Sequence, residues 1–316
     1  MNNTTLGRRL SAAIFCAACL PAPSANGATV AVDCDAGGTV AGALNDLEPG
    51  DTLLVSGLCR EHVTIPAEVS RITLDGQGKT TIQHPGSAGM AGPATHVFYV
   101  RGKEIAIKGF RLTGGRDGVH VSGPASVVID GNAIVDNMLR GIHVDKGSVA
   151  QIINNTIENN RGIGVNVSEN SNARIGFFIP PSQVLAPNAI RSNGDHGINV
   201  ERGSSAWIVG NTISNNGGSG VYVDRMSQAD VVANVIDANR ADGVTATHGS
   251  GVNLQSEASP RPEGPNQTGS KSKNAGFGIR CAIGGYVDGP LGTLSGASGA
   301  KDFDDSCIDL VIDPPP

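Results

Sequence analysis

Residues 118–121 read Gly-Val-His-Val, and this frame of a glycine before a short alternating strand returns at intervals along the chain. Its later copies are Gly141-Ile-His-Val, Gly164-Val-Asn-Val, Gly197-Ile-Asn-Val, Gly220-Val-Tyr-Val, Gly243-Val-Thr-Ala and Gly278-Ile-Arg-Cys. The steps between copies are 23, 23, 33, 23, 23 and 35 residues. A nearly fixed period of this length indicates a solenoid in which each repeat is one structural unit.

Each central repeat carries a second feature, the pattern Asn-x-Ile-x-x-Asn, which occupies residues 132–137, 155–160, 188–193, 211–216 and 234–239. The last asparagine follows the repeat glycine by 19 residues in four of the five cases, and the exception holds a 10-residue insertion around Phe177-Phe-Ile. If each repeat is one coil, equivalent residues lie about 4.8 Å apart in a parallel sheet. We therefore expect the asparagines to stack at a turn and to hydrogen-bond from coil to coil.

Two apolar positions recur with the same period and are expected to face inward as continuous ladders. One ladder consists of Ile134, Ile157, Ile190, Ile213 and Ile236, and the other of Val119, Ile142, Val165, Ile198 and Val221. The frame lacks the leucines and the helix of a leucine-rich repeat and the hexapeptide period of a left-handed β-helix. The sequence predicts an all-β fold, a single-stranded right-handed parallel β-helix.

The repeated Gly-Ile/Val-x-Val and Asn-x-Ile-x-x-Asn patterns resemble the right-handed parallel β-helix repeat of the pectin-lyase-like superfamily. That group includes pectate lyases, polygalacturonases, alginate epimerases and β-helix proteins of the periplasmic copper-binding type. The regular match covers about residues 96–240, and residues 241–316 are expected to form irregular coils and a C-terminal cap. The C-terminal stretch resembles uncharacterised exported bacterial β-helix proteins.

The composition agrees with a solenoid. The 316 residues include 44 glycines and only 3% aromatics, which suits a fold of many tight turns in which glycine supplies positive φ. The net charge of −6 argues against a nucleic-acid partner, which usually needs a basic face. No segment of the mature chain has the apolar length to span a bilayer.

The N-terminal residues 1–27 have the layout of a secretory signal peptide, with Arg8 and Arg9 before the apolar stretch 10–20 and small residues near a cleavage site. A lipoprotein signal that uses Cys19 is the alternative. Residues 28–316 then form one β-helix domain of a secreted or periplasmic protein. Residues 39–47 place apolar side chains on one helical face, which predicts a short helix that caps the open end of the solenoid.

Four cysteines remain in the mature chain, and they allow three pairings. Sequence proximity favours the pairs Cys34–Cys59 and Cys281–Cys307, each closing a loop of about 25 residues, worth about 3 kcal/mol in the chain-entropy model. Buried free thiols are the alternative. Disulfides agree with an oxidising compartment and therefore with export.

Strand alternation places the residue two positions after each repeat glycine on the outer face. The candidates for substrate binding on this face are His120, His143, Asn166, Asn199 and Tyr222. Members of the superfamily that process polysaccharides bind sugars along this strand face, so the resemblance implies a glycan partner. The alternative is an ordinary polar face with no ligand.

His120 and His143 fall on adjacent coils, where they could share a metal or act as base and acid, with Asp117 or Asp145 as a third group. The catalytic signatures of polygalacturonases and alginate epimerases are absent. The outward residues of the repeats also lack the clustered carboxylates of a pectate-lyase calcium site. We therefore assign no catalytic residue and predict no cofactor, with calcium left open. The functional expectation is a polysaccharide-binding or polysaccharide-processing protein. The alternatives are a non-catalytic scaffold and a periplasmic copper-handling accessory protein.

Overall fold

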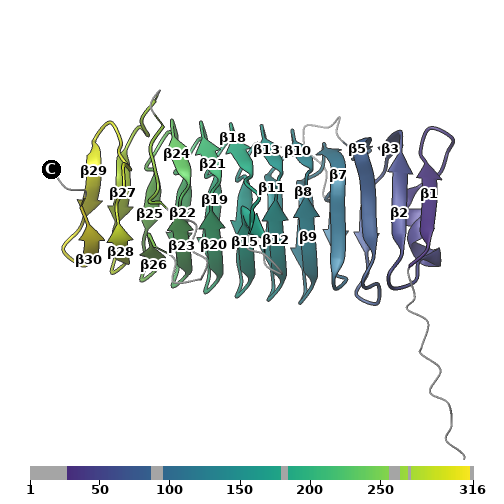
Figure 1. Cartoon of the computed structure of the whole chain (residues 1–316), viewed down its shortest axis with the longest axis horizontal. Helices are drawn as coiled ribbons and strands as arrows, with labels where there is room; N and C mark the ends of the chain where they lie inside the picture. Colours follow the sequence, from purple (N-terminus) through teal and green to yellow (C-terminus); the bar gives the residue numbers. More distant parts are fainter. Residues whose placement is uncertain (1–26, 87–94, 179–183, 256–263, 270–271, 314–316) are drawn as a thin grey trace, which may run out of the picture.

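The chain folds as a right-handed parallel β-helix, which confirms the predicted fold. The structure is a computed structural model that describes residues 27–86, 95–178, 184–255, 264–269 and 272–313. Strands of successive coils lie side by side along the long axis, with the N-terminal coil at one end and the C-terminal coil at the other (Figure 1). Each repeat therefore contacts mainly its two neighbours, as expected for a solenoid.

One face of the solenoid is a ten-stranded parallel sheet, called here the site sheet. Its strands, in spatial order, are β4 (Val63–Ile65), β6 (Phe98–Val100), β8 (Asp117–Ser122), β11 (Arg140–Asp145), β14 (Val165–Val167), β19 (Ile198–Glu201), β22 (Val221–Asp224), β25 (Val244–Ala246), β27 (Phe277–Cys281) and β29 (Gly299–Phe303). The repeat frame found in the sequence supplies the strands from β8 to β27.

A second face, called here the groove face, is a longer parallel row of strands. It consists of β1 (Thr29–Asp33), β2 (Thr52–Ser56), β5 (Thr73–Gln83), β7 (Ile105–Thr113), β9 (Ser126–Asp130), β12 (Val149–Ile153), β15 (Asn172–Ile175), β20 (Ser205–Val209), β23 (Gln228–Val232), β26 (Gly251–Asn253), β28 (Tyr286–Pro290) and β30 (Ile308–Ile312).

The third face carries the isoleucines of the Asn-x-Ile pattern. Its strands are β3 (Leu58–Arg60), the second halves of β5 and β7, β10 (Ala133–Val135), β13 (Thr156–Glu158), β18 (Ala189–Arg191), β21 (Thr212–Ser214) and β24 (Val235–Asp237). β5 contributes to two faces, because Gln77 and Gly78 turn the chain at positive φ while strand pairing with β7 continues, with a shifted register.

The two apolar ladders form the core, and every one of their ten side chains is fully buried. The repeat glycine lies against this core: a Cβ on Gly141 would stand 2.5 Å from Cγ2 of Ile157 and 2.7 Å from the carbonyl oxygen of Gly164. The repeat glycine is therefore required by close packing. Positive φ falls instead on turn residues such as Asp136 and Asn154, one position before a stacked asparagine.

The asparagines stack as expected and form two hydrogen-bonded ladders inside the turns. In one ladder Nδ2 of Asn160 donates to Oδ1 of Asn193 at 2.9 Å and to the carbonyl oxygen of Ile134 at 3.1 Å. In the other, Nδ2 of Asn155 makes the equivalent bonds to Asn188 and Ile129. Both ladders continue past the regular repeats, to Asn266 and Asn274. Buried turns of this kind are stable because their polar groups are paired.

The N-terminal end of the solenoid is covered by the predicted helix, which the structure resolves as α1 (Val40–Ala43) followed by the 3-10 turn η1 (Leu44–Asp46). Val40 and Leu44 are buried in the core. The Glu61 carboxylate accepts the backbone N–H groups of Val40 and Ala41, at 2.8 and 3.0 Å, and so satisfies two donors at the helix start. Residues 1–26 of the predicted signal peptide lie outside the described residues.

Charged residues occupy core positions at the C-terminal end of the solenoid. The inward position that holds Ile279 on β27 holds Lys301 on β29, and Asp309 occupies the position in register with Val287. Nζ of Lys301 lies 3.0 Å from Oδ2 of Asp309 and 3.3 Å from Oδ2 of Asp313. Charges that replace core residues on the last coil discourage further strand addition at this edge.

Both expected disulfides are present. Cys34 pairs with Cys59, with Cα atoms 5.0 Å apart, and Cys281 pairs with Cys307, with Cα atoms 6.1 Å apart. Each links neighbouring coils at one end of the solenoid. Among the described residues, no helix is long and apolar enough to cross a membrane.

The insertion in the third regular repeat forms a small antiparallel pair, β16 (Phe177–Phe178) and β17 (Val184–Leu185). Phe177 packs against Val209 and Val232 in a satellite cluster outside the main core. The insertion thus packs beside the groove face, where the Phe177 ring stacks on Trp207.

Candidate functional site

The five candidate residues lie on consecutive strands of the site sheet and in register. The full row of outward side chains in this register, called here the outer row, is Thr64, Tyr99, His120, His143, Asn166, Asn199, Tyr222, Thr245, Arg280 and Asp302. Tyr99 was not among the candidates because Val97 stands in its coil where later coils have glycine. Counting the strand frame back by one coil would have found it.

The middle of the outer row is more covered than a sheet surface would be. Asn166, Asn199 and His143 are only 1%, 6% and 8% exposed, although their strands point them away from the core. Nδ2 of Asn199 donates to Oδ1 of Asn166 at 2.8 Å, and Nδ2 of Asn166 donates to Oε1 of Glu201 at 3.5 Å. The row is therefore a packed polar layer, in which neighbouring side chains cover these three outward residues.

Four residues form a continuous polar chain over β6, β8 and β11, called here the His–Asp chain. Oδ2 of Asp117 lies 3.0 Å from Nδ1 of His96, and Nε2 of His96 lies 2.9 Å from Nδ1 of His120. Nε2 of His120 lies 3.0 Å from Oδ2 of Asp145. The sequence named Asp117 and Asp145 as third groups but not His96, which precedes its strand by two residues and belongs to an irregular coil.

His143 lies beside this chain and touches both carboxylates. Its ring stacks on that of His120, with centroids 4.5 Å apart and planes 20° apart. Its Nε2 is 3.1 Å from Oγ of Ser168 and 3.8 Å from Oδ2 of Asp145, and its Nδ1 is 4.0 Å from Oδ2 of Asp117. The two histidines expected on adjacent coils thus meet with Asp145 as the third group.

The electrostatics of the cluster favour neutral His143 and ionised carboxylates. Burial first, then the charges of Arg140 and His120, lower the pKa of His143 to about 3, against the opposing effect of Asp117 and Asp145. Burial raises the pKa of Asp145, but hydrogen bonds from His120 and Ser122 and the nearby histidine charges outweigh it and bring the value to about 2.

Asp117 is fully buried but also remains ionised. Desolvation raises the pKa of Asp117. The hydrogen bond from His96 and the charge of Arg140 together outweigh desolvation, so the net shift of the pKa is downward. The Arg140 guanidinium lies 3.7 Å from Oδ1 of Asp117, and the Arg140 backbone N–H donates to the same oxygen at 3.1 Å. This arginine compensates one of the two buried charges.

A second group of rings lies further along the site sheet. Tyr222 and His196 stack, with ring centroids 4.3 Å apart and planes 13° apart. The backbone N–H of Ser219 donates to Nδ1 of His196 at 3.0 Å, which fixes the ring. Burial is the main cause that lowers the pKa of His196 and raises the pKa of Tyr222. Tyr222 is half-buried, so part of it faces solvent.

Ion pairs run along one edge of the outer row. Oε2 of Glu201 lies 3.0 Å from Nη1 of Arg225 and 3.8 Å from Nε of Arg202. Arg225 also contacts Asp224 at 3.4 Å, and Nδ1 of His248 lies 2.8 Å from Oδ1 of Asp224. At the opposite edge, Arg116 and Arg161 are exposed and form no ion pair within the described part of the chain. Such side chains are available to an anionic partner.

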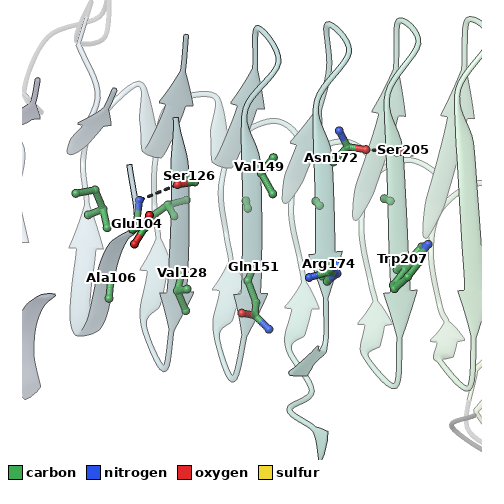
Figure 2. A pocket seen from close by; sticks show the side chains of 15 residues that line it. Glu104, Ala106, Ser126, Val128, Val149, Gln151, Asn172, Arg174, Ser205 and Trp207 are labelled. Carbon is green, nitrogen blue, oxygen red and sulfur yellow. Dashed lines mark hydrogen bonds between the residues drawn. The ribbon is translucent and has the colours of Figure 1, made fainter. Parts of the chain in front are cut away.

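The groove face carries a shallow groove of about 610 Å³ that the sequence analysis did not predict. It crosses β7, β9, β12, β15 and β20, and Figure 2 shows Ala106, Val128, Gln151, Arg174 and Trp207 along it. The Trp207 ring stacks on the Phe177 ring, with centroids 5.9 Å apart. The guanidinium carbon of Arg174 lies 5.3 Å from the centroid of the Trp207 ring. Most of its other lining is small or aliphatic, so it offers few groups that could carry chemistry.

Two kinds of chemistry fit the arrangement on the site sheet. The imidazoles of His96 and His120, which lie between Asp117 and Asp145, can relay a proton. Two imidazole nitrogens and a carboxylate oxygen also match the donor set of zinc and related transition metals, whereas calcium and magnesium prefer oxygen ligands. The groove face offers neither.

Comparison with known proteins agrees with this architecture. The family model described as "Right handed beta helix region" matches residues 96–258, more than half of the 316 residues. The chain therefore belongs to the right-handed β-helix family. No curated protein matches the sequence.

Solved structures share the fold at low sequence identity. The pectate lyase Pel9A superposes with a TM-score of 0.55 at 15% identity and covers 88% of this chain and 79% of its own. The A-module of mannuronan C-5 epimerase AlgE6 from Azotobacter vinelandii gives 0.54 at 14%, with 92% of each chain covered. A double mutant of the periplasmic alginate epimerase AlgG gives 0.51 at 15%, covering 91% and 73%. At these identities the likeness establishes the fold.

Proposed function

We propose that this chain binds and acts on a polysaccharide along the outer row of the site sheet. The observation that carries the proposal is the concentration of buried histidine and aspartate on this one face. The His–Asp chain and His143 bring five ionisable groups together over three strands. Burying such groups is costly, so a site is a better explanation of the cluster than stability is.

The length of the row suits a linear polymer. Outward side chains of adjacent strands are about 4.8 Å apart, so the stretch from His120 to Tyr222 is comparable to several sugar units. Tyr222 offers a partly exposed aromatic ring for one sugar face, which is a favourable contact for a glycan. The fold neighbours, a pectate lyase and mannuronan epimerases by their names, act on polysaccharides, which supports the same class of partner here.

The exposed arginines indicate an acidic glycan. Arg116 and Arg161 precede strands β8 and β14 of the site sheet and are free of ion pairs within the described residues. Arginine pairs with carboxylates in a bidentate manner, so a uronate polymer is favoured over a neutral one. Because the whole chain carries a net charge of −6, its overall charge repels an acidic glycan. The attraction must therefore come from these arginines at short range.

The binding test compares two faces of one molecule. We expect isothermal titration with polygalacturonate and polymannuronate to show binding, with Tyr222→Ala weakening it about tenfold, equal to about 1.4 kcal/mol. Trp207→Ala, on the groove face, is the matched aromatic control and should leave affinity unchanged. Equal loss in Trp207→Ala would move the site to the groove face, and no binding to any glycan would favour the non-catalytic scaffold.

Processing requires a separate measurement. Lyase activity produces unsaturated uronates that absorb in the ultraviolet, and epimerisation exchanges the C5 hydrogen with solvent deuterium. We expect one of these signals with a uronate polymer and its loss in His120→Ala. Binding without either signal would reduce the proposal to recognition.

We also propose that the protein is exported to the periplasm or the cell exterior. The signal-like residues 1–27 and the two disulfides both fit that route. N-terminal sequencing of the protein recovered from an expressing bacterium should give a mature chain that begins near residue 28. A full-length chain that stays in the cytoplasm would contradict export.

A further inference from the structure

We infer that His120, His143 and Asp145 form a binding site for one divalent transition-metal ion of the zinc and copper type. Their ligand atoms lie within 4.8 Å of one another, on two adjacent strands of the site sheet. The inference goes beyond glycan binding and does not depend on it.

The separations between the donor atoms fit a small ion. Oδ2 of Asp145 is 3.0 Å from Nε2 of His120 and 3.8 Å from Nε2 of His143. Zinc ligands lie about 2.0–2.2 Å from the metal, so ligands of a tetrahedral site are about 3.3 Å apart. The two measured separations lie on either side of that value, and small side-chain rotations would equalise them.

The neighbouring residues form the support that metal-bound histidines usually have. When Nε2 of His120 binds the ion, its Nδ1–H is free to donate to Nε2 of His96 at 2.9 Å. Nδ1 of His96 in turn lies 3.0 Å from Oδ2 of Asp117. Histidine ligands almost always donate their second N–H to a carboxylate or a similar acceptor, and here the carboxylate is reached through one more imidazole.

Burial and charge around Asp145 also favour a bound cation. Oδ1 of Asp145 is buried and has no donor in hydrogen-bonding geometry among the described residues. A buried carboxylate oxygen without a partner is rare and needs an explanation. Asp117 and Asp145 carry two negative charges against one nearby arginine, Arg140, so a cation would improve the local balance.

The choice of His143 over His96 as the third ligand follows from geometry. Both nitrogens of His96 already face other side chains, Nε2 at 2.9 Å from Nδ1 of His120 and Nδ1 at 3.0 Å from Oδ2 of Asp117. His143 instead presents Nε2 to Asp145, at 3.8 Å, and to Ser168, at 3.1 Å. With three protein ligands, one position stays open for water or a sugar oxygen, as in catalytic metal sites.

The test is titration of the full mature chain with Zn²⁺ and Cu²⁺, without glycan, followed by calorimetry and by metal analysis after gel filtration. We expect one ion per chain and a higher melting temperature with metal, because an ion that binds only the folded state stabilises it. His143→Ala and Asp145→Asn should weaken binding more than about 100-fold, and His96→Gln about 10–100-fold.

His248→Ala is the matched control. It removes another histidine paired with an aspartate on the same face, at 2.8 Å from Asp224, and should leave metal binding unchanged. A wild-type protein that binds no ion, or ligand variants that bind as well as the wild type, would overturn the inference.

Binding of Co²⁺ to the wild type gives a readout that holds even if a ligand variant fails to fold. A four- or five-coordinate site should give intense visible absorption bands, and absence of these bands would contradict the proposed geometry. Metal binding without glycan binding would leave this inference intact while refuting the proposed function. Glycan binding without metal binding would refute this inference and leave the proposed function intact.

Discussion

Asn137 and Asn160, equivalent residues on neighbouring coils, are joined twice. Both the backbone N–H and the side-chain Nδ2 of Asn137 donate to Oδ1 of Asn160, at 3.1 and 2.9 Å. Both side chains are fully buried or nearly so. The coil period found in the sequence is thus also the repeat of a hydrogen-bonded ladder, and each asparagine connects three coils.

Asn160→Ala should be strongly destabilising. The change removes the acceptor for two donors of Asn137 and leaves the Ile134 carbonyl oxygen unpaired. Each buried unpaired group costs about 1–3 kcal/mol, so we expect a loss of about 2–5 kcal/mol in the free energy of unfolding, measured by urea denaturation. Asn45→Ala, at an exposed asparagine, should shift it by less than about 0.5 kcal/mol. Equal effects would refute the structural role of the ladder.

Gly141→Ala should also destabilise the solenoid, by about 1–3 kcal/mol or more. The new Cβ would meet Ile157 and a backbone oxygen of the next coil at 2.5 and 2.7 Å, and the backbone cannot retreat without opening the sheet. The control is Gly131→Asn, where φ is 64°, no atom lies within 4 Å of the new Cβ and the next coil already has Asn154. Thermal melting of the two variants should separate them clearly.

Cys281→Ser combined with Cys307→Ser should lower stability by about 3 kcal/mol, because the bridge closes a loop of 26 residues in the unfolded chain. The loss should be concentrated in the last coils, since solenoid units interact only with neighbours. Hydrogen exchange should therefore rise in β27–β30 and stay low around β11. Uniform exchange along the chain would show that the solenoid unfolds as one unit.

His196 should make stability depend on pH. Its pKa is lowered in the folded state, mainly by burial, against the raising effects of Asp195, the Ser219 hydrogen bond and Asp224. The unfolded chain then binds more protons as pH falls through about 6.5, so stability is present above that value and is lost below it. Relative to wild type, His196→Gln should lose less stability between pH 7.5 and 5.0 in denaturation curves. Parallel curves would exclude this contribution.

Lys301→Leu combined with Asp309→Leu should promote association of the C-terminal ends. The pair occupies inward positions of the last coil, where apolar residues would continue the core to an open edge. Apolar edges of this kind pair with other chains. Light scattering after gel filtration should show dimers or larger species in the variant at concentrations where the wild type does not change. Unchanged mass would show that the charges do not protect the end.

The sequence predicted most of the fold because the fold is local and periodic. The glycine and asparagine frames identified the coils from residue 118 to residue 240, and the cysteines and the helix at residues 39–47 identified the two ends. The irregular coils were predicted less well. The repeat frame does not extend to β1, β3 and β5, and in β5 a bend at positive φ interrupts the strand while its pairing continues.

The candidate site was predicted only in part. The register of His120, His143, Asn166, Asn199 and Tyr222 follows from the period alone. The role of His96 and the burial of Asn166 do not, because both depend on which side chains converge above the sheet from coils of unequal length.

The sequence by itself determined the coil, its core ladders and the face on which polar residues lie, since each depends on one repeat stacked on the next. The tertiary structure decided which titratable groups meet, how deeply they are buried and therefore which of them are neutral. Those properties arise from side chains of different coils that share one low-dielectric space, and no periodic pattern encodes that arrangement.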